Sequence, residues 1–225
     1  MKSVIAAASL SVALGYAVKR PFKFIQESQQ TSQLASTTET ASTSISLPYQ
    51  YTDSMNGYIY NKDDGSLSSY LDTSLTEDIA ADLNLEKLTM SLTESGQVFN
   101  IEEVVDFNNY VAYIYYPDYN YCESYDFSGE NEVDLKAIID QINAGEWTTY
   151  LGQKTVGWSD ETFDAYEFHD KFYDAYETLY LNIDDNTWAY DSFEDYLVLE
   201  FTQSPTAATF TSDHFVISGC TPDSF

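Results

Sequence analysis

Residues 177–201 read "ETLYLNIDDNTWAYDSFEDYLVLEF", and this stretch decides the fold. It combines three tyrosines, one tryptophan and two phenylalanines with seven acidic residues, and it contains no lysine or arginine. Its runs "ETLYLNI", "TWAYDSF" and "DYLVLEF" are separated by Asp and Asn, which favour turns. Aromatic rings suit the pleated surface of a strand, while acids on the solvent face keep exposed edges soluble. The stretch therefore predicts three consecutive strands.

Two further strand-like runs, "EWTTYLGQKTVGW" and "FDAYEFHD", precede this stretch, and the best helix of the chain precedes them. The helix is predicted over residues 131–143, where Asn131 and Asp134 can cap its start and Gly145 can stop it. Its apolar stripe includes Ile138 and Ile142. The helix lies between groups of strands, so we expect it to pack on a sheet rather than on other helices.

The first half of the chain also reads mostly as strands. Asp64-Gly65 lies between two strand-like runs and predicts a hairpin. Residues 75–88 have apolar residues near helical spacing, which indicates a short helix or a loop. Residues 88–93 alternate as a strand, and residues 111–116 are apolar on both faces, which favours a central strand covered on both sides. The fold class is α+β: a curved antiparallel sheet with one or two helices on its concave face.

The N-terminal region predicts export. Residues 1–17 hold one lysine, then an uncharged run with small residues near a possible cleavage point after Ala17, as in a secretory signal peptide. A membrane anchor is the alternative, but the run is shorter than the roughly 20 residues that span a bilayer. Residues 18–47 are rich in Ser, Thr and Gln and predict a flexible segment, followed by one domain over residues 48–225. We expect a secreted protein, extracellular or in the lumen of the secretory pathway, with no membrane span.

Charge restricts the partners. The chain has 37 acids and 9 bases, a net charge of −28. Four bases precede residue 24 and all acids follow it, so the rest of the chain carries −32. Phosphate backbones and anionic lipid surfaces would be repelled, so nucleic acid is excluded as a partner. Cations, basic proteins and neutral or apolar ligands remain possible.

Cys122 and Cys220 are the two cysteines. Their spacing matches no zinc pattern, and in an oxidising compartment the expected state is one disulfide that links the strand after Tyr121 to the C-terminal tail.

Several quoted segments resemble a known family. These are "VVDFNNYVAYIYYPDYNYCESYDF", the helix, "YLGQKTVGW", the hairpin strands "ETLYLNI" and "TWAYDSF", and the ending "FTSDHFVISGC". Together they resemble the eukaryotic LolA-like and ependymin-related secreted proteins over roughly residues 50–220. The resemblance implies a half-barrel sheet wrapped around a helix, with an apolar cavity that holds acyl chains in bacterial lipoprotein carriers.

Motifs for catalysis and for metals are weak. His169 and His214 each lie near an aspartate without a serine in a recognisable catalytic setting, so we expect no enzyme. The acidic segment around Gly65 lacks the ligand positions of an EF-hand, which leaves only weak, non-specific calcium binding. We expect no cofactor and no specific metal site.

The expected function is binding of an apolar ligand, a lipid or fatty acid, in a concave cavity of the sheet. Residues two apart on a strand share a wall, and the helix should cover that wall or simply fill the space. The candidate ligand-binding residues are Val111, Tyr113, Tyr115, Ile138, Ile142, Leu179, Leu181 and Ile183. The alternative is an acidic, cation-responsive structural, matrix or adhesion protein of a secretory granule or extracellular layer.

Overall fold

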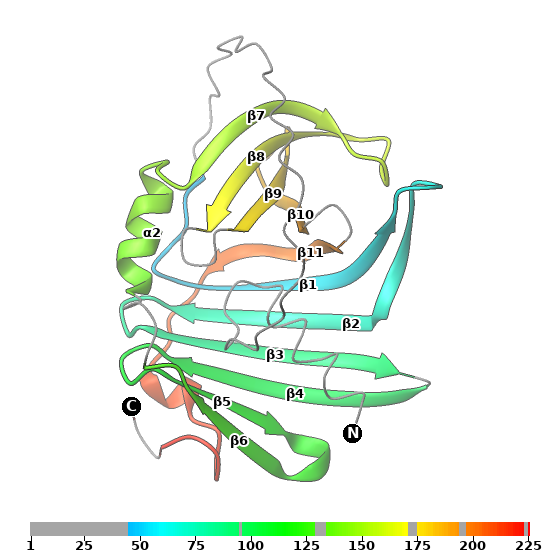
Figure 1. Cartoon of the computed structure of the whole chain (residues 1–225). Coiled ribbons are helices and arrows are strands. Elements are labelled where there is room, and N and C mark those ends of the chain that lie inside the picture. Colours follow the sequence, from blue (N-terminus) through cyan, green and yellow to red (C-terminus); the bar gives the residue numbers. More distant parts are fainter. Residues whose placement is uncertain (1–44, 95, 129–133, 171–174, 194–196, 223–224) are drawn as a thin grey trace.

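The computed structural model describes residues 45–94, 96–128, 134–170, 175–193, 197–222 and 225. Eleven strands form one antiparallel sheet in the order β6-β5-β4-β3-β2-β1-β11-β10-β9-β8-β7 (Figure 1). The strands are β1 Gln50–Asn61, β2 Ser66–Ala80, β3 Leu85–Glu94, β4 Gln97–Asp106, β5 Val111–Tyr116, β6 Tyr121–Asp126, β7 Thr148–Thr155, β8 Thr162–Asp170, β9 Ala175–Asn182, β10 Trp188–Phe193 and β11 Leu197–Ala207. All five strands predicted after the helix are present.

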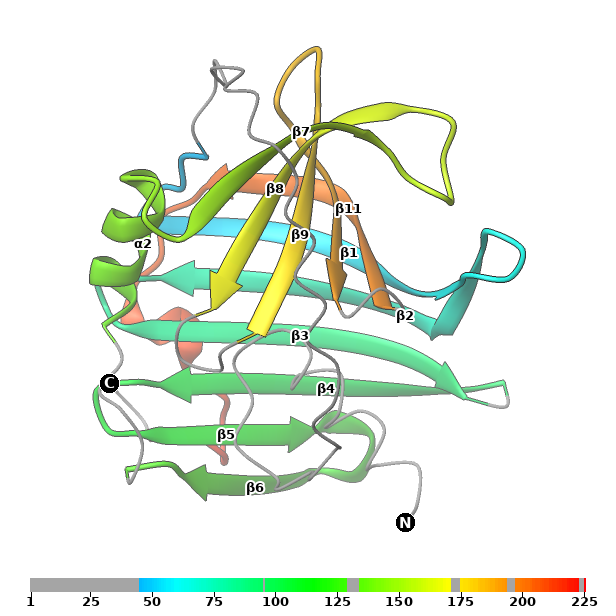
Figure 2. The same ribbon diagram turned by 45° about the horizontal axis from the view of Figure 1, so that its top comes forward.

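The sheet consists of two meanders, β1–β6 and β7–β11, which meet where β1 pairs with β11. The first hairpin forms at the predicted position, with Gly65 at a positive φ of 71°. Strands β7–β9 cross the direction of β2–β5 in Figure 2, in keeping with the twist of large sheets. The sheet is open, because β6 and β7 each pair with one strand only among the described residues. An antiparallel sheet with a helix is therefore confirmed.

Helix α2, Leu135–Asn143, packs on one face of the sheet. The Asp134 carboxylate accepts a hydrogen bond from the Ala137 amide at 3.1 Å and so caps the helix, as predicted. Gly145 follows the helix with a positive φ of 76°. Asn131, the other predicted cap, lies outside the described residues. The predicted stripe is buried, including Ile138 and Ile142.

The two faces of the sheet have different covers. Opposite residues of an antiparallel pair point to the same face, so the register assigns each side chain to a side. We call the face that contacts α2 the helix side; it carries Ile79, Val105 and Ala112. The other face, the tail side, carries Ala80 and Val104 and is covered by residues 210–220 of the C-terminal segment.

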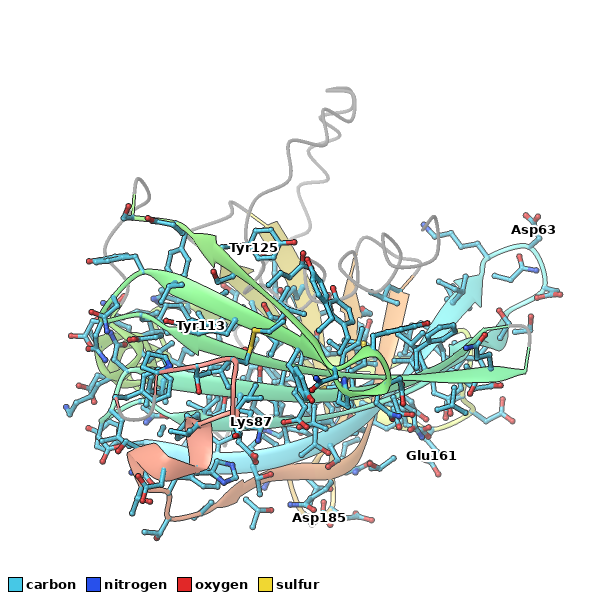
Figure 3. The ribbon with its side chains drawn as sticks, turned by 90° about the horizontal axis from the view of Figure 1, so that it is seen from below. Asp63, Lys87, Tyr113, Tyr125, Glu161 and Asp185 are labelled. Carbon is cyan, nitrogen blue, oxygen red and sulfur yellow. A yellow bond between two sulfur atoms is a disulfide. The ribbon has the colours of Figure 1, made fainter. Side chains whose placement is uncertain are left out.

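The C-terminal segment is linked covalently to the sheet. Its short 3-10 helix η2, Ser212–Phe215, places Phe215 fully inside the tail-side core. Cys220 forms the predicted disulfide with Cys122 of β6, with the two Cα atoms 5.5 Å apart (Figure 3). The His214 Nε2 atom lies 2.8 Å from the Asp78 Oδ2 atom of β2. This histidine therefore contributes to docking of the segment on the sheet.

Two local predictions were wrong. Residues 75–88 form no helix: they make the end of β2, a turn over residues 81–84 and the start of β3, so a loop is present only between the two strands. Their alternation was hidden by Glu77 and Glu86, acids that point to the buried helix side. Residues 111–116 form β5, which is second from the edge and not central. This strand is apolar on both faces because α2 and the C-terminal segment cover opposite sides of the sheet.

The described part of the chain begins within the segment predicted to be flexible. The predicted signal peptide, residues 1–17, lies outside the described residues, as does the flexible segment up to residue 44. Ile45 and Leu47 are buried in the helix-side core, and the Leu47 amide donates to Asn143 at 2.6 Å. The packed domain thus starts at or before Ile45 rather than at residue 48. No helix among the described residues has the length and apolar character needed to cross a membrane.

Candidate functional site

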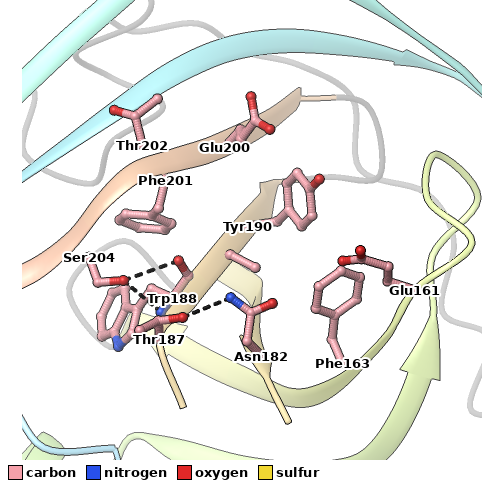
Figure 4. Close-up of a pocket in the computed structure, with 11 residues that line it drawn as sticks. Glu161, Phe163, Asn182, Thr187, Trp188, Tyr190, Glu200, Phe201, Thr202 and Ser204 are labelled. Carbon is pink, nitrogen blue, oxygen red and sulfur yellow. Dashed lines mark hydrogen bonds between the residues drawn. The ribbon is translucent and has the colours of Figure 1, made fainter. Parts of the chain in front are cut away.

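A cleft opens where strands β10 and β11 separate. Their backbone pairing runs from Phe193 to Tyr190 and ends there. At Trp188 a side chain takes the place of the partner strand: the Trp188 amide donates to the Ser204 hydroxyl at 2.9 Å, and that hydroxyl donates to the Trp188 carbonyl at 3.3 Å (Figure 4). A register shift between Trp188 and Tyr190 against β9 accompanies the separation.

The cleft has a volume of about 390 Å³, within the range of small-ligand sites. Figure 4 shows its walls, which come from β8 to β11 and the turns beside them. The lining residues are Glu161, Phe163, Asn182, Thr187, Trp188, Ala189, Tyr190, Glu200, Phe201, Thr202 and Ser204. Four aromatic rings and two carboxylates thus line one cavity.

The aromatic walls are held by contacts between rings. The Trp188 and Phe201 rings meet edge to face with their centroids 5.2 Å apart, and the Phe163 and Tyr190 rings do so at 5.5 Å. Trp188 and Phe201 also pack against the helix-side core. Such pairs add about 0.5–1.5 kcal/mol beyond burial of their area. The walls are therefore preformed rather than assembled by a ligand.

The carboxylates make this cleft electronegative. Glu200 accepts a hydrogen bond from the Tyr58 hydroxyl at 3.0 Å. Burial, together with the nearby charges of Glu200 and Glu161, raises the pKa of Tyr190 above its ordinary value. The Tyr190 hydroxyl therefore stays protonated at neutral pH and can donate a hydrogen bond. A ligand with an anionic group would be repelled here, whereas a neutral or cationic polar group would be accepted.

The candidate residues chosen from the sequence fall into three places. Ile138, Ile142, Leu179 and Leu181 meet in one buried cluster on the helix side. Val111, Tyr113 and Tyr115 are not brought to this cluster, because they alternate with Ala112 and Ile114 and so point to the tail side. Ile183, at the end of β9, is 39% exposed. None of these residues lines the cleft.

Sequence reasoning missed the cleft. Its aromatic residues were recognised as strand residues, but nothing in "NTWAY" shows that β10 pairs with β11 only from Tyr190 onward. The hydroxyl of Ser204, sixteen residues away in the chain, replaces a strand partner, and such a contact has no sequence signature.

A second feature lies on the helix side, where acids occupy buried positions. Asp53 of β1 lies opposite Glu77 of β2, which lies opposite Leu88 of β3, which in turn lies opposite Glu103 of β4. Glu86 occupies the next row, opposite Ile79 and Val105. We call Asp53, Glu77, Glu86 and Glu103 the carboxyl band. It separates the helix-side core into the cluster around α2 and the cluster around Met55 and Met90.

Burial shifts the acidity of the carboxyl band. Asp53, Glu86 and Glu103 are exposed by only 2%, 3% and 5%, and this burial raises the pKa of Glu103 to about 7. Burial and the charge of Asp78 also raise the pKa of Glu77 to about 7. Burial and then the charge of Glu77 raise the pKa values of Asp53 and Glu86. The interaction between the two side chains lowers the pKa of Glu77 and raises the pKa of Glu86, but burial is the largest cause for both.

No group of three or more His, Cys, Asp or Glu side chains is placed to hold a metal ion in the part of the chain that the structure describes. No protein-family model matches the sequence, and no curated protein matches it significantly.

Proposed function

We propose that this protein is a secreted binding protein for an apolar or amphiphilic ligand, and that the ligand occupies the cleft between β10 and β11. The observation that carries this proposal is the preformed cavity of about 390 Å³ lined by Phe163, Trp188, Tyr190 and Phe201. The partly exposed rings of Trp188, Tyr190 and Phe201 offer apolar faces at little entropic cost, because packing already fixes their rotamers; Phe163 is 1% exposed and contacts Tyr190 from the interior.

The charge of the cleft narrows the ligand class. The carboxylate of a fatty acid would be repelled by Glu161 and Glu200, and by the net charge of −32 that the chain carries after residue 23. We therefore propose a ligand with a neutral polar group. Tyr190 and Thr202 provide hydroxyl groups for that polar group, whereas the Ser204 hydroxyl already bonds the backbone of Trp188.

The proposal includes the half-barrel arrangement that the family resemblance implies. Its support is the cluster around α2, which contains Ile79 and Val105 from the first meander together with Tyr166 and Leu179 from the second. These strands are far apart in the sheet order. A sheet that bends around the helix would bring both groups of strands into contact with it.

Filling the cleft tests the proposal. Ala189→Trp places a large ring in the cavity and should weaken binding of a neutral, single-chain fluorescent lipid probe about tenfold, a loss of about 1.4 kcal/mol. Ala144→Trp, at an exposed position after α2, is the matched control and should leave binding unchanged. A fluorescence titration measures both. Equal binding by the two variants, or tighter binding of a fatty-acid probe than of the neutral probe, would contradict the proposal.

A second candidate function, an acidic and cation-responsive matrix or adhesion protein, is favoured by one observation. Acidic turns project from the sheet, including Asp63 and Asp185 in Figure 3. Burial does not restrict access to these side chains, so they could exchange weakly bound cations with a surrounding matrix.

The excess charge predicts that salt stabilises the protein. At a net charge of −32 beyond residue 23, self-repulsion disfavours the compact state, and about 0.15 M salt screens charges beyond roughly 8 Å. The melting temperature should rise by several degrees between low salt and about 0.15 M sodium chloride. Calcium chloride at equal ionic strength should raise it further if cations also promote association. A melting curve that is the same in all three solutions would be inconsistent with this prediction.

A further inference from the structure

We propose that the carboxyl band is a binding site for a linear organic polyamine, independent of the cleft. Asp53, Glu77, Glu86 and Glu103 converge on one buried face of β1–β4, whereas the cleft is built from β8–β11. The two sites share no residue.

Unpartnered atoms are the first reason to expect a ligand. The Asp53 Oδ1 and Glu86 Oε2 atoms are buried and have no hydrogen-bond partner among the residues that the structure describes. An unpaired buried polar atom costs about 1–3 kcal/mol, and more when it is charged. Asp53 and Glu86 are almost fully buried and each has an acceptor atom without a partner. A ligand that donates hydrogen bonds to these atoms would remove this cost.

The distribution of cations is the second reason. Lys87 is the only lysine or arginine in strands β1 to β4 as the structure describes them. It lies opposite Val104, so it points to the tail side, where its ammonium group is 3.4 Å from Glu102. On α2, Lys136 is exposed and bonded to Asp140 at 3.1 Å. Among the residues that the structure describes, the carboxyl band thus faces no cation from β1 to β4 or from α2.

The spacing of the acids selects a polyamine. Adjacent strands are about 4.8 Å apart, so Asp53 and Glu77 are separated by one such interval, and Glu77 and Glu103, with Leu88 of β3 between them, by about 9.6 Å. A linear polyamine carries ammonium groups along its length and can meet carboxyls spaced in such a row. A single metal ion would need three ligands at one point, and no such group exists among the described side chains. The row is also bordered by Met55 and Leu75 on one side and by Ile79 and Val105 on the other, which suits methylene groups.

Access to the band is provided at Glu77. This side chain is only partly buried, unlike those of Asp53, Glu86 and Glu103. One ammonium group could therefore enter at Glu77 and bring the next into contact with its buried neighbours. Burial raises the pKa of Glu77 and of Glu86, and an ammonium group beside them would favour the ionised carboxylates, so binding of a polyamine should release protons.

Calorimetric titration of the full chain with spermidine tests this site. In about 0.15 M sodium chloride we expect saturable binding of one spermidine per chain with release of protons, measured in buffers of different ionisation enthalpy. The double substitution Asp53→Asn and Glu86→Gln removes two charge-assisted acceptors and should weaken binding tenfold or more. The control, Glu146→Gln with Asp160→Asn, makes the same charge change at exposed positions and should leave the affinity within about twofold.

Three results would overturn the proposal. Many weak sites that disappear with ionic strength would indicate diffuse attraction to the acidic surface. Displacement of spermidine by calcium at one equivalent would indicate a metal site. Equal weakening by the test and control variants would place the binding elsewhere. If circular dichroism shows that the double variant is unfolded, Glu103→Gln replaces it: a tenfold loss supports the site, and an unchanged affinity refutes it.

Discussion

Loss of the Cys122–Cys220 disulfide should lower the free energy of unfolding by about 2–4 kcal/mol. The bridge joins residues 98 positions apart, and the chain-entropy model gives about 4.7 kcal/mol for a loop of about 100 residues. The bond thus restricts the unfolded chain strongly, because it links the sixth strand to the last segment. A double Cys122→Ser, Cys220→Ser variant should therefore unfold at a clearly lower urea concentration than the oxidised protein.

The folded state of this variant should change little. Phe215 and Ile217 remain buried against Ala80 and Val104, and His214 remains bonded to Asp78. We therefore expect native tryptophan fluorescence before the transition. The free energy of unfolding should fall somewhat more steeply with urea concentration, because the unfolded chain without the bridge exposes more surface. The double-serine protein in reductant is the control for effects of the reductant itself. An unfolding midpoint equal to that of the oxidised wild type would contradict the prediction.

The parts of the fold that could be predicted from the sequence follow simple alternation. In residues 177–201 each strand has apolar or aromatic residues on the buried face and turn residues at its ends, so β9, β10 and β11 were recognised. Helix α2 was recognised because its isoleucines and its Asp134 cap indicate the same element.

The errors arose where a buried position holds an unexpected residue. In residues 75–88, Glu77 and Glu86 point to the same face of the sheet as Leu75, Ile79 and Leu88. The acids interrupt the apolar side of each strand, so the alternation typical of a strand was concealed. The sequence also cannot show to which face of the sheet Tyr113 points. Both faces are covered, one by α2 and the other by the C-terminal segment, so β5 is apolar on both sides. The cleft depends on a hydroxyl group that replaces a backbone partner, which is a tertiary contact.

Buried acids also determine how stability should depend on pH. Burial raises the pKa of Glu103 from its ordinary value of 4.5 to about 7, so between these values the folded chain holds a proton that the unfolded chain releases. Stability therefore falls as the pH rises from 4.5 to 7 and stays low above 7, the reverse of the usual behaviour of a paired carboxylate. Glu77 and Asp191, with pKa values raised to about 7 by burial, act in the same direction.

The substitution Glu103→Gln isolates one of these groups. A carboxyl whose pKa is 4.5 unfolded and about 7 folded loses about 3 kcal/mol of stability across that window, so the variant should be more stable than wild type at pH 8 by up to about that amount. At about pH 3, below both pKa values, the two proteins should be about equally stable, since the carboxyl is then protonated in the folded and in the unfolded chain. Glu146→Gln, at an exposed position, should match wild type at both values. Urea denaturation of protein stripped of bound cations measures the three curves. A wild-type stability that rises from pH 5 to pH 8 would contradict the prediction. It would mean that the carboxyl band is ionised in the folded protein, with pKa values lowered by a bound cation rather than raised by burial.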